Sequence, residues 1–123
     1  MCVHPRVLIV EDEPMILMDL VETVTELGYR VVDKAETLAK GMVLARDLDL
    51  DGAVLDVNLA GQTSTGIADI LRERGVPFLL LTGYTKEGLP KEHRENPHLE
   101  KPWGPASLSR ALDELMHPHG SIH

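Results

Sequence analysis

The sequence predicts an α/β protein in which a parallel sheet is covered by helices on both faces. Short aliphatic runs alternate with segments whose apolar residues recur at helical spacing, and most of the runs end in a polar residue. Strict alternation of strands and helices is typical of parallel sheets, because each crossover connection uses a helix. A chain of 123 residues can bury one core. We therefore expect one domain over residues 1–117 and a disordered tail over residues 118–123.

The first strand is expected over Arg6–Val10, a run of mostly β-branched aliphatic residues. Residues 11–14 (EDEP) follow and are typical of a helix start, because carboxylates cap free N–H groups and proline suits the first turn. Gly28 is expected to end this helix. Its inner face is formed by apolar residues at helical spacing: Leu17, Leu20, Val21, Val24 and Leu27.

The same pattern continues along the chain. Further strands are expected over residues 29–35, 53–56, 78–81 and 98–100. Helices fill the intervals, with apolar inner faces that include Leu38, Met42 and Ala45, then Ile67, Ile70 and Leu71, and finally Leu108, Ala111, Leu112, Leu115 and Met116. A loop with asparagine and glycine is expected over residues 58–63. Residues 83–96 contain glycines, a proline and almost no apolar side chains, so the fourth helix should be short or poorly ordered.

Composition excludes several classes of protein. A formal charge of −8 argues against a nucleic-acid binder, which would present a basic face to phosphates. Cys2 is the sole cysteine, so neither a disulfide framework nor a thiolate metal site is expected. No apolar run approaches the length of a membrane span, and the first residues lack a signal-peptide pattern. We therefore expect a cytoplasmic protein with no nucleic-acid or membrane partner.

Four of the five expected strands end in polar residues that could do chemistry: Glu11 with Asp12, Asp56, Thr82 and Lys101. Taken singly, Asp12 could cap a helix and Asp56 could form an Asx-turn. Thr82 could be a turn residue, and Lys101 a solvated loop cation. All of them, however, fall at equivalent ends of parallel strands, which is the edge where open α/β sheets bind ligands.

Carboxylates gathered at one edge repel one another unless a cation is present. Two or three carboxylate oxygens together with waters suit Mg²⁺. With that charge neutralised, Asp56 becomes a plausible nucleophile toward a phosphoryl group. The metal, the Lys101 ammonium and the Thr82 hydroxyl could then share the phosphoryl oxygens, since phosphoryl transfer depends mostly on positioning and charge compensation.

These residues resemble the receiver domain of two-component response regulators. The resemblance covers residues 6–116 and is carried by RVLIVEDEP, VLDVNLAG, LLLTGY and EKPW, in that order. It implies a flavodoxin-like, doubly wound sheet of five parallel strands in the order 2-1-3-4-5, with helices on both faces. It also implies roles for individual residues: Glu11 and Asp12 as the metal-binding acids, Asp56 as phospho-acceptor, Asn58 as a backbone-carbonyl metal ligand, Thr82 as switch hydroxyl and Lys101 as phosphate-sensing lysine.

Within the family, PFLLLTGYTKEGLP is similar to the signature of a single-domain bacterial subgroup named for its Phe-Ala-Thr-Gly-x-Tyr motif, with Leu80 and Leu81 departing from it. Members of that subgroup associate with histidine kinases of the HWE type. Many receivers carry an aromatic switch residue three positions before the lysine, where this chain has His98. The plainer interpretation of His98 is an exposed edge-strand histidine rather than a pH sensor. Tyr84 could take over part of the switch or gate access to the phosphate.

The resemblance implies a stand-alone receiver that accepts a phosphoryl group on Asp56 from a histidine kinase or a phosphotransfer protein, with Mg²⁺ as cofactor. It would signal through protein contacts, as a monomer or weak homodimer without an attached output module. It would catalyse only its own phosphotransfer and dephosphorylation, so we do not expect an enzyme in the ordinary sense. Alternatives are a receiver-like binding module without phosphorylation and a phosphate sink or relay intermediate. A flavodoxin-like cofactor binder is disfavoured by the acids after the first strand, and a haloacid-type phosphatase by Asn58 where a second aspartate is needed.

Overall fold

The computed structural model describes residues 4–59, 61–82, 98–100 and 104–116. The strands and helices along the chain are β1 (Arg6–Val10), α1 (Pro14–Glu26), β2 (Arg30–Ala35), α2 (Leu38–Asp47), β3 (Gly52–Asp56), β4 (Asn58–Leu59), β5 (Gln62–Thr63), α3 (Thr65–Glu73), β6 (Phe78–Thr82), β7 (His98–Glu100) and α4 (Pro105–Met116). The expected fourth helix, between β6 and β7, and the expected disordered tail lie outside the described residues.

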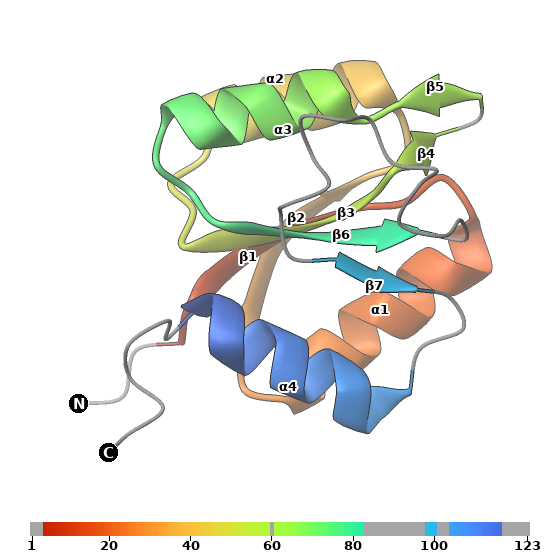
Figure 1. Ribbon diagram of the computed structural model, residues 1–123, viewed down its shortest axis with the longest axis vertical. Coiled ribbons are helices and arrows are strands. Elements are labelled where there is room, and N and C mark those ends of the chain that lie inside the picture. The colour runs from red at the N-terminus through yellow and green to blue at the C-terminus, as the bar shows by residue number, and fades with distance from the viewer. Residues whose placement is uncertain (1–3, 60, 83–97, 101–103, 117–123) are drawn as a thin grey trace.

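Five parallel strands form one sheet in the order β2-β1-β3-β6-β7. When the two short strands β4 and β5 are set aside, this is the predicted order 2-1-3-4-5, so the flavodoxin-like α/β prediction is confirmed. The expected loop over residues 58–63 is instead a small antiparallel hairpin, in which Asn58 pairs with Thr63 and Leu59 pairs with Gln62. This hairpin projects from the end of the molecule at which the sheet strands end (Figure 1).

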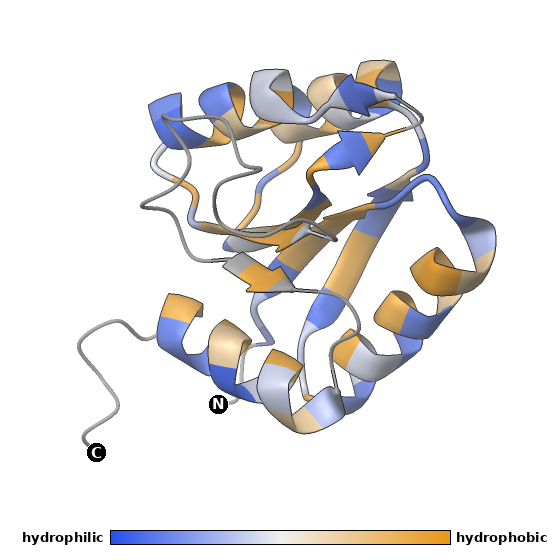
Figure 2. Cartoon of the chain, turned by 45° about the vertical axis from the view of Figure 1, so that its right-hand side comes forward, coloured by the Kyte–Doolittle hydropathy of each residue, from blue (hydrophilic) through white to orange (hydrophobic). Residues whose placement is uncertain are grey.

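The core consists of two apolar layers on opposite faces of the sheet. Helices α2 and α3 cover one face, while α1 and α4 cover the other (Figure 1). Successive residues of β1 alternate between the layers: Leu8 and Val10 belong to the layer under α2 and α3, and Val7 and Ile9 to the layer under α1 and α4. Each helix buries an apolar stripe in one of these layers, and hydrophobic and hydrophilic residues alternate along the helices (Figure 2).

The predicted inner faces of the helices are largely confirmed. Helix α1 buries Leu17, Leu20 and Val24, while Val21 and Leu27 are partly buried. In α3 the fully buried residues are Ile67, Ala68 and Leu71, and the predicted Ile70 is only partly buried. Helix α4 buries Leu108, Leu112 and Leu115, as its spacing predicts.

The start of α1 differs in detail from the prediction. Pro14 occupies the first helical turn, as expected, but the side chain of the N-cap residue Glu13 makes no capping hydrogen bond. Instead, the Glu13 backbone N–H donates to Oε2 of Glu11 over 3.0 Å. Glu11, which follows β1, is therefore the acid that accepts a hydrogen bond at the start of α1. This bond links the first turn of α1 to the edge of the sheet.

The end of α3 is tied to the end of α2. Arg74 follows α3, and its Nη1 donates to the carbonyl oxygens of Ala45 and Leu48 over 2.5 and 2.7 Å. These carbonyls belong to the last turn of α2 and its C-cap, where backbone acceptors lack helical partners. A cation at a helix C-terminus is also favoured by the helix dipole. Arg74 thus fixes the two helices of this face relative to one another.

Gly41 is buried in α2 and faces Ile67 of α3. A Cβ added there would lie 2.5 Å from Cδ1 of Ile67, whereas a Cβ added at Gly66 would meet Met42 at an ordinary 3.4 Å. We therefore expect Gly41→Ala to lower the free energy of unfolding by about 1 kcal/mol, because overpacking outweighs the gain in helix propensity. The matched variant Gly66→Ala should be neutral or stabilising. Urea denaturation of both variants measures this, and equal stabilities would contradict the close packing of α2 on α3.

Candidate functional site

The sheet register brings the polar strand ends to one edge. Val10 of β1 pairs with Leu55 of β3, so that Glu11 follows its strand at the same level as Asp56. Asp56 in turn pairs with Leu81, the residue before Thr82. The Glu11 backbone N–H continues the ladder by donating to the Ala35 carbonyl over 3.0 Å. Residues that are far apart in the sequence therefore lie close together at one edge, or rim, of the parallel sheet.

Three carboxylates converge at this rim. One oxygen from each of Glu11, Asp12 and Asp56 can be chosen so that all three lie within 4.8 Å of one another. Glu11 is fully buried and Asp56 is 4% exposed, while Asp12 is partly exposed. Carboxylates this close and this dry repel strongly when all are ionised. Their oxygen-only donor set fits a hard divalent cation, and the partly exposed side of the cluster leaves room for the waters that Mg²⁺ retains.

Asp56, the candidate phospho-acceptor, accepts a hydrogen bond from the loop that follows it. The Asn58 backbone N–H donates to Oδ1 of Asp56 over 3.2 Å. The residue between them, Val57, is bound on both sides: its N–H donates to the Leu81 carbonyl over 2.9 Å and its carbonyl accepts from the Ser64 N–H over 2.9 Å. Asp56 is thus attached to a backbone that is hydrogen-bonded to β6 and to the residue preceding α3.

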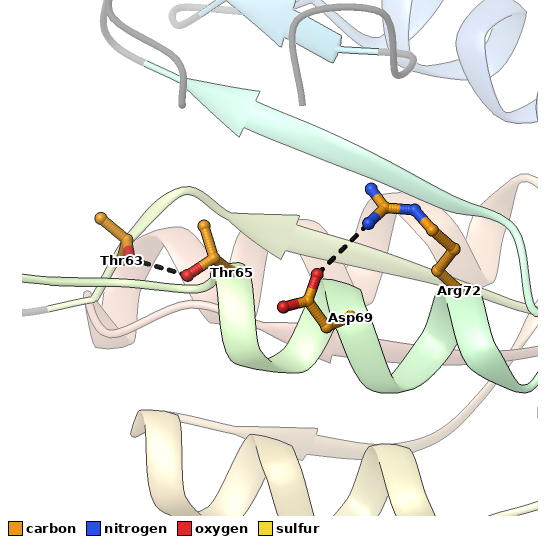
Figure 3. A network of polar contacts seen from close by, with 4 residues as sticks. All are labelled: Thr63, Thr65, Asp69 and Arg72. Atoms are coloured by element: carbon orange, nitrogen blue, oxygen red, sulfur yellow. Dashed lines mark hydrogen bonds and ion pairs between the residues drawn. The ribbon is translucent and has the colours of Figure 1, made fainter. Parts of the chain in front are cut away.

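The hairpin after Asp56 has several further attachments. Leu59 is 1% exposed and packs into the core layer under α2 and α3. The hydroxyls of Thr63 and Thr65 share a hydrogen bond of 3.1 Å that joins β5 to the start of α3 (Figure 3). At the turn, Oδ1 of Asn58 accepts from the Gly61 N–H over 2.9 Å. Gly61 has a φ of +88°, a conformation that glycine adopts without strain.

The structure describes part of the predicted site. It brings together Glu11, Asp12 and Asp56, and it places Asn58 directly beyond them. Thr82 ends β6, is 1% exposed and pairs with Glu100 of β7. His98 begins β7 and pairs with Leu80. The predicted Lys101 and Tyr84 lie outside the described residues.

Sequence reasoning missed an apolar surface on α1. Met15 and Met18 are 83% and 62% exposed and line a surface pocket with Ile16, Asp19 and Glu22. Helix α1 carries three acidic residues and no basic one. The two methionines lie three positions apart and outside the buried stripe of Leu17, Leu20 and Val24, so a second apolar stripe at helical spacing was a signal that could have identified this surface.

Comparison with known proteins decides the family. The family model of the response regulator receiver domain matches residues 7–113. The chain belongs to this family. The receiver is a signalling domain of two-component response regulators, and its family fold agrees with the sheet order described above.

Several individual relatives are similar over most of the chain. The phyllosphere-induced regulator PhyR of Methylorubrum extorquens is 33% identical over 115 residues, which are 90% of this chain and 43% of that protein. The transcriptional regulatory protein PdtaR of Mycobacterium tuberculosis is 31% identical over 112 residues, which are 88% of this chain and 55% of that protein. The receiver thus spans about half the length of the curated relatives it matches.

Among solved structures, SdrG from Sphingomonas melonis Fr1 is 35% identical with a TM-score of 0.82, covering 94% of this receiver and 99% of that chain. The receiver domain of PhyR from Erythrobacter litoralis is 27% identical with a TM-score of 0.82, covering 98% and 95%. In the part of the receiver that the structure describes, no helix combines the length and the apolarity needed to cross a membrane.

Proposed function

We propose that this receiver accepts a phosphoryl group on Asp56 from a histidine kinase, in a reaction that depends on Mg²⁺, and then signals through protein contacts. The observation that carries this proposal is the convergence of the Glu11, Asp12 and Asp56 carboxylates in a chain of the receiver family. A related chain, SdrG, which is 35% identical, has a BeF₃-activated conformation. That relationship supports the proposal that this chain, too, has an activated conformation.

Glu11, Asp12 and Asp56 would hold the cation through their side chains, and Asn58 through its backbone carbonyl. When bound, Mg²⁺ neutralises the carboxylates and compensates charge on the transferring phosphoryl group. Asp56 is the acceptor in this scheme because it ends the central strand β3 and its Oδ1 is oriented by the Asn58 N–H. The buried Glu11, tied to the start of α1 through the Glu13 N–H, is suited to a fixed ligand role.

The transfer itself would be a direct displacement at phosphorus. A carboxylate oxygen of Asp56 forms the new P–O bond while the P–N bond of the phosphohistidine breaks, and the bonding electron pair remains on the imidazole nitrogen. Two further residues would compensate the phosphoryl charge: the hydroxyl of Thr82 and the ammonium of Lys101. Tyr84 and His98 are the candidates for relaying the change to a partner.

The donor is proposed to contact α1. Met15 and Met18 form an exposed apolar surface four to seven residues beyond Glu11, and Asp19 and Glu22 lie beside it. Because α1 bears acidic side chains without basic ones, a complementary partner surface carries apolar and basic side chains. A helix of an HWE-type kinase that presents such a surface could bring its phosphohistidine to Asp56.

Acetyl phosphate with Mg²⁺ should add one phosphoryl group to the wild-type protein, because phosphoryl transfer in this scheme depends on the receiver's own residues. Asp56→Asn should abolish the addition, since the amide is a poor nucleophile. Intact-mass spectrometry measures both. An added phosphoryl mass that survives the substitution would overturn the assignment of Asp56, and no addition to the wild type would favour a receiver-like binding module.

Mg²⁺ should stabilise the wild-type protein, because the cation binds only the assembled carboxylates. At one hundred times its dissociation constant the expected gain is about 2.7 kcal/mol. Asp12→Asn should lose most of that gain, while Asp19→Asn, which removes the same charge from the exposed side of α1, should retain it. Thermal denaturation with and without Mg²⁺ provides the comparison. Equal gains in both variants would show that the cation binds elsewhere.

Donor contact with α1 predicts selective loss of kinase-dependent labelling. Replacing Met15 and Met18 by lysine removes apolar area and introduces positive charge toward a basic partner, and phosphotransfer should slow about tenfold, equivalent to about 1.4 kcal/mol. The matched control is Val43→Lys on α2, which is 48% exposed on the opposite layer. Labelling by an ATP-charged HWE-type kinase is measured beside labelling by acetyl phosphate. The proposal fails if both variants slow equally with the kinase, or if acetyl phosphate labelling falls to the same extent.

A further inference from the structure

The side chain of Asn58 is part of the turn that follows the acceptor. Its Oδ1 accepts from the Gly61 N–H over 2.9 Å, while its own backbone N–H donates to Oδ1 of Asp56 over 3.2 Å. Asn58 is therefore bonded in two directions, toward the carboxylate cluster through its backbone and toward the hairpin turn through its side chain. Neither bond involves the other strands of the sheet.

We propose that the Asn58 side chain is a positioning group for the cation site, and that it acts through the turn. This inference rests on the proposed function, since it concerns the same cluster. With its N–H and its Oδ1 both engaged, the Asn58 residue has little freedom to rotate about its backbone bonds. Its backbone carbonyl, the ligand in the proposed function, would thereby be kept in one orientation next to Asp56.

The geometry of the turn supports a dedicated role for this bond. The hairpin strands are two residues each, so their ladder supplies few hydrogen bonds of its own. Gly61 adopts a φ of +88°, and a Cβ added there would meet nothing within 4 Å, so the glycine serves the backbone conformation rather than a tight packing contact. In that conformation the Gly61 N–H donates to Oδ1 of Asn58.

Other attachments keep the hairpin folded when the Asn58 side chain is removed. Leu59 is buried in the core, and the Thr63 hydroxyl bonds that of Thr65 at the start of α3 (Figure 3). Val57 remains bonded to Leu81 and Ser64 through its backbone. We therefore expect truncation at Asn58 to remove its side-chain bond to the turn while the protein stays folded.

The test compares Asn58→Ala with Gln62→Ala, which truncates an exposed amide side chain on the same hairpin. Three quantities are measured on the full chain: the Mg²⁺ dissociation constant by calorimetry, amide exchange at Gly61, and the thermal midpoint. We expect Asn58→Ala to raise the dissociation constant about tenfold, the effect typical of removing a group that orients a metal ligand, and to speed exchange at Gly61. Gln62→Ala should change neither quantity.

A conservative variant separates the hydrogen bond from the residue's bulk. Asn58→Asp keeps an oxygen that can accept from Gly61, so protection of that amide should be restored, whereas its added charge makes its cation affinity unsuitable as a test. The proposal is overturned if Asn58→Ala binds Mg²⁺ as the wild type does, or if only its thermal midpoint changes, which would indicate a merely structural role. A wild type that binds no Mg²⁺ would instead overturn the proposed function, and this inference with it.

Discussion

Mutual repulsion of carboxylates is the constraint on which the site depends. Glu11, Asp12 and Asp56 approach within 4.8 Å because β1 and β3 are neighbours in a parallel sheet, and the two apolar layers hold those strands side by side. The apolar core therefore maintains an electrostatically unfavourable arrangement at its edge. A divalent cation would compensate the charge of these carboxylates, so the packing of the core would favour cation binding at this edge.

The main helices could be predicted from the helical spacing of their apolar residues, and the sheet strands from short aliphatic runs between those helices. The sheet order required the family resemblance, since alternation alone specifies parallel strands but not which strand is central. The site carboxylates could be predicted from the parallel arrangement. Residues that end parallel strands lie at one edge of the sheet, whatever their separation along the chain.

Other features could not be fully predicted, because they depend on contacts between residues that no periodic pattern in the sequence indicates. The strands β4 and β5 have two residues each, which is shorter than any alternation can reveal. At the start of α1 the carboxylate that accepts a backbone hydrogen bond is that of Glu11, not that of the N-cap residue Glu13. Only the side-chain geometry distinguishes the two. Met15 and Met18 lie outside the predicted inner stripe of α1, which the sequence could indicate, but how far they are exposed depends on where the neighbouring elements lie.

The bonds of Val57 have a mechanical consequence. Its N–H reaches β6 and its carbonyl reaches the residue before α3, so the backbone immediately after Asp56 is clamped between a strand and a helix on either side of it. These two hydrogen bonds oppose movement of the backbone at Val57 when the charge on Asp56 changes. Through the Val57 N–H, the backbone after Asp56 is linked by one hydrogen bond to Leu81, the residue before Thr82 at the end of β6.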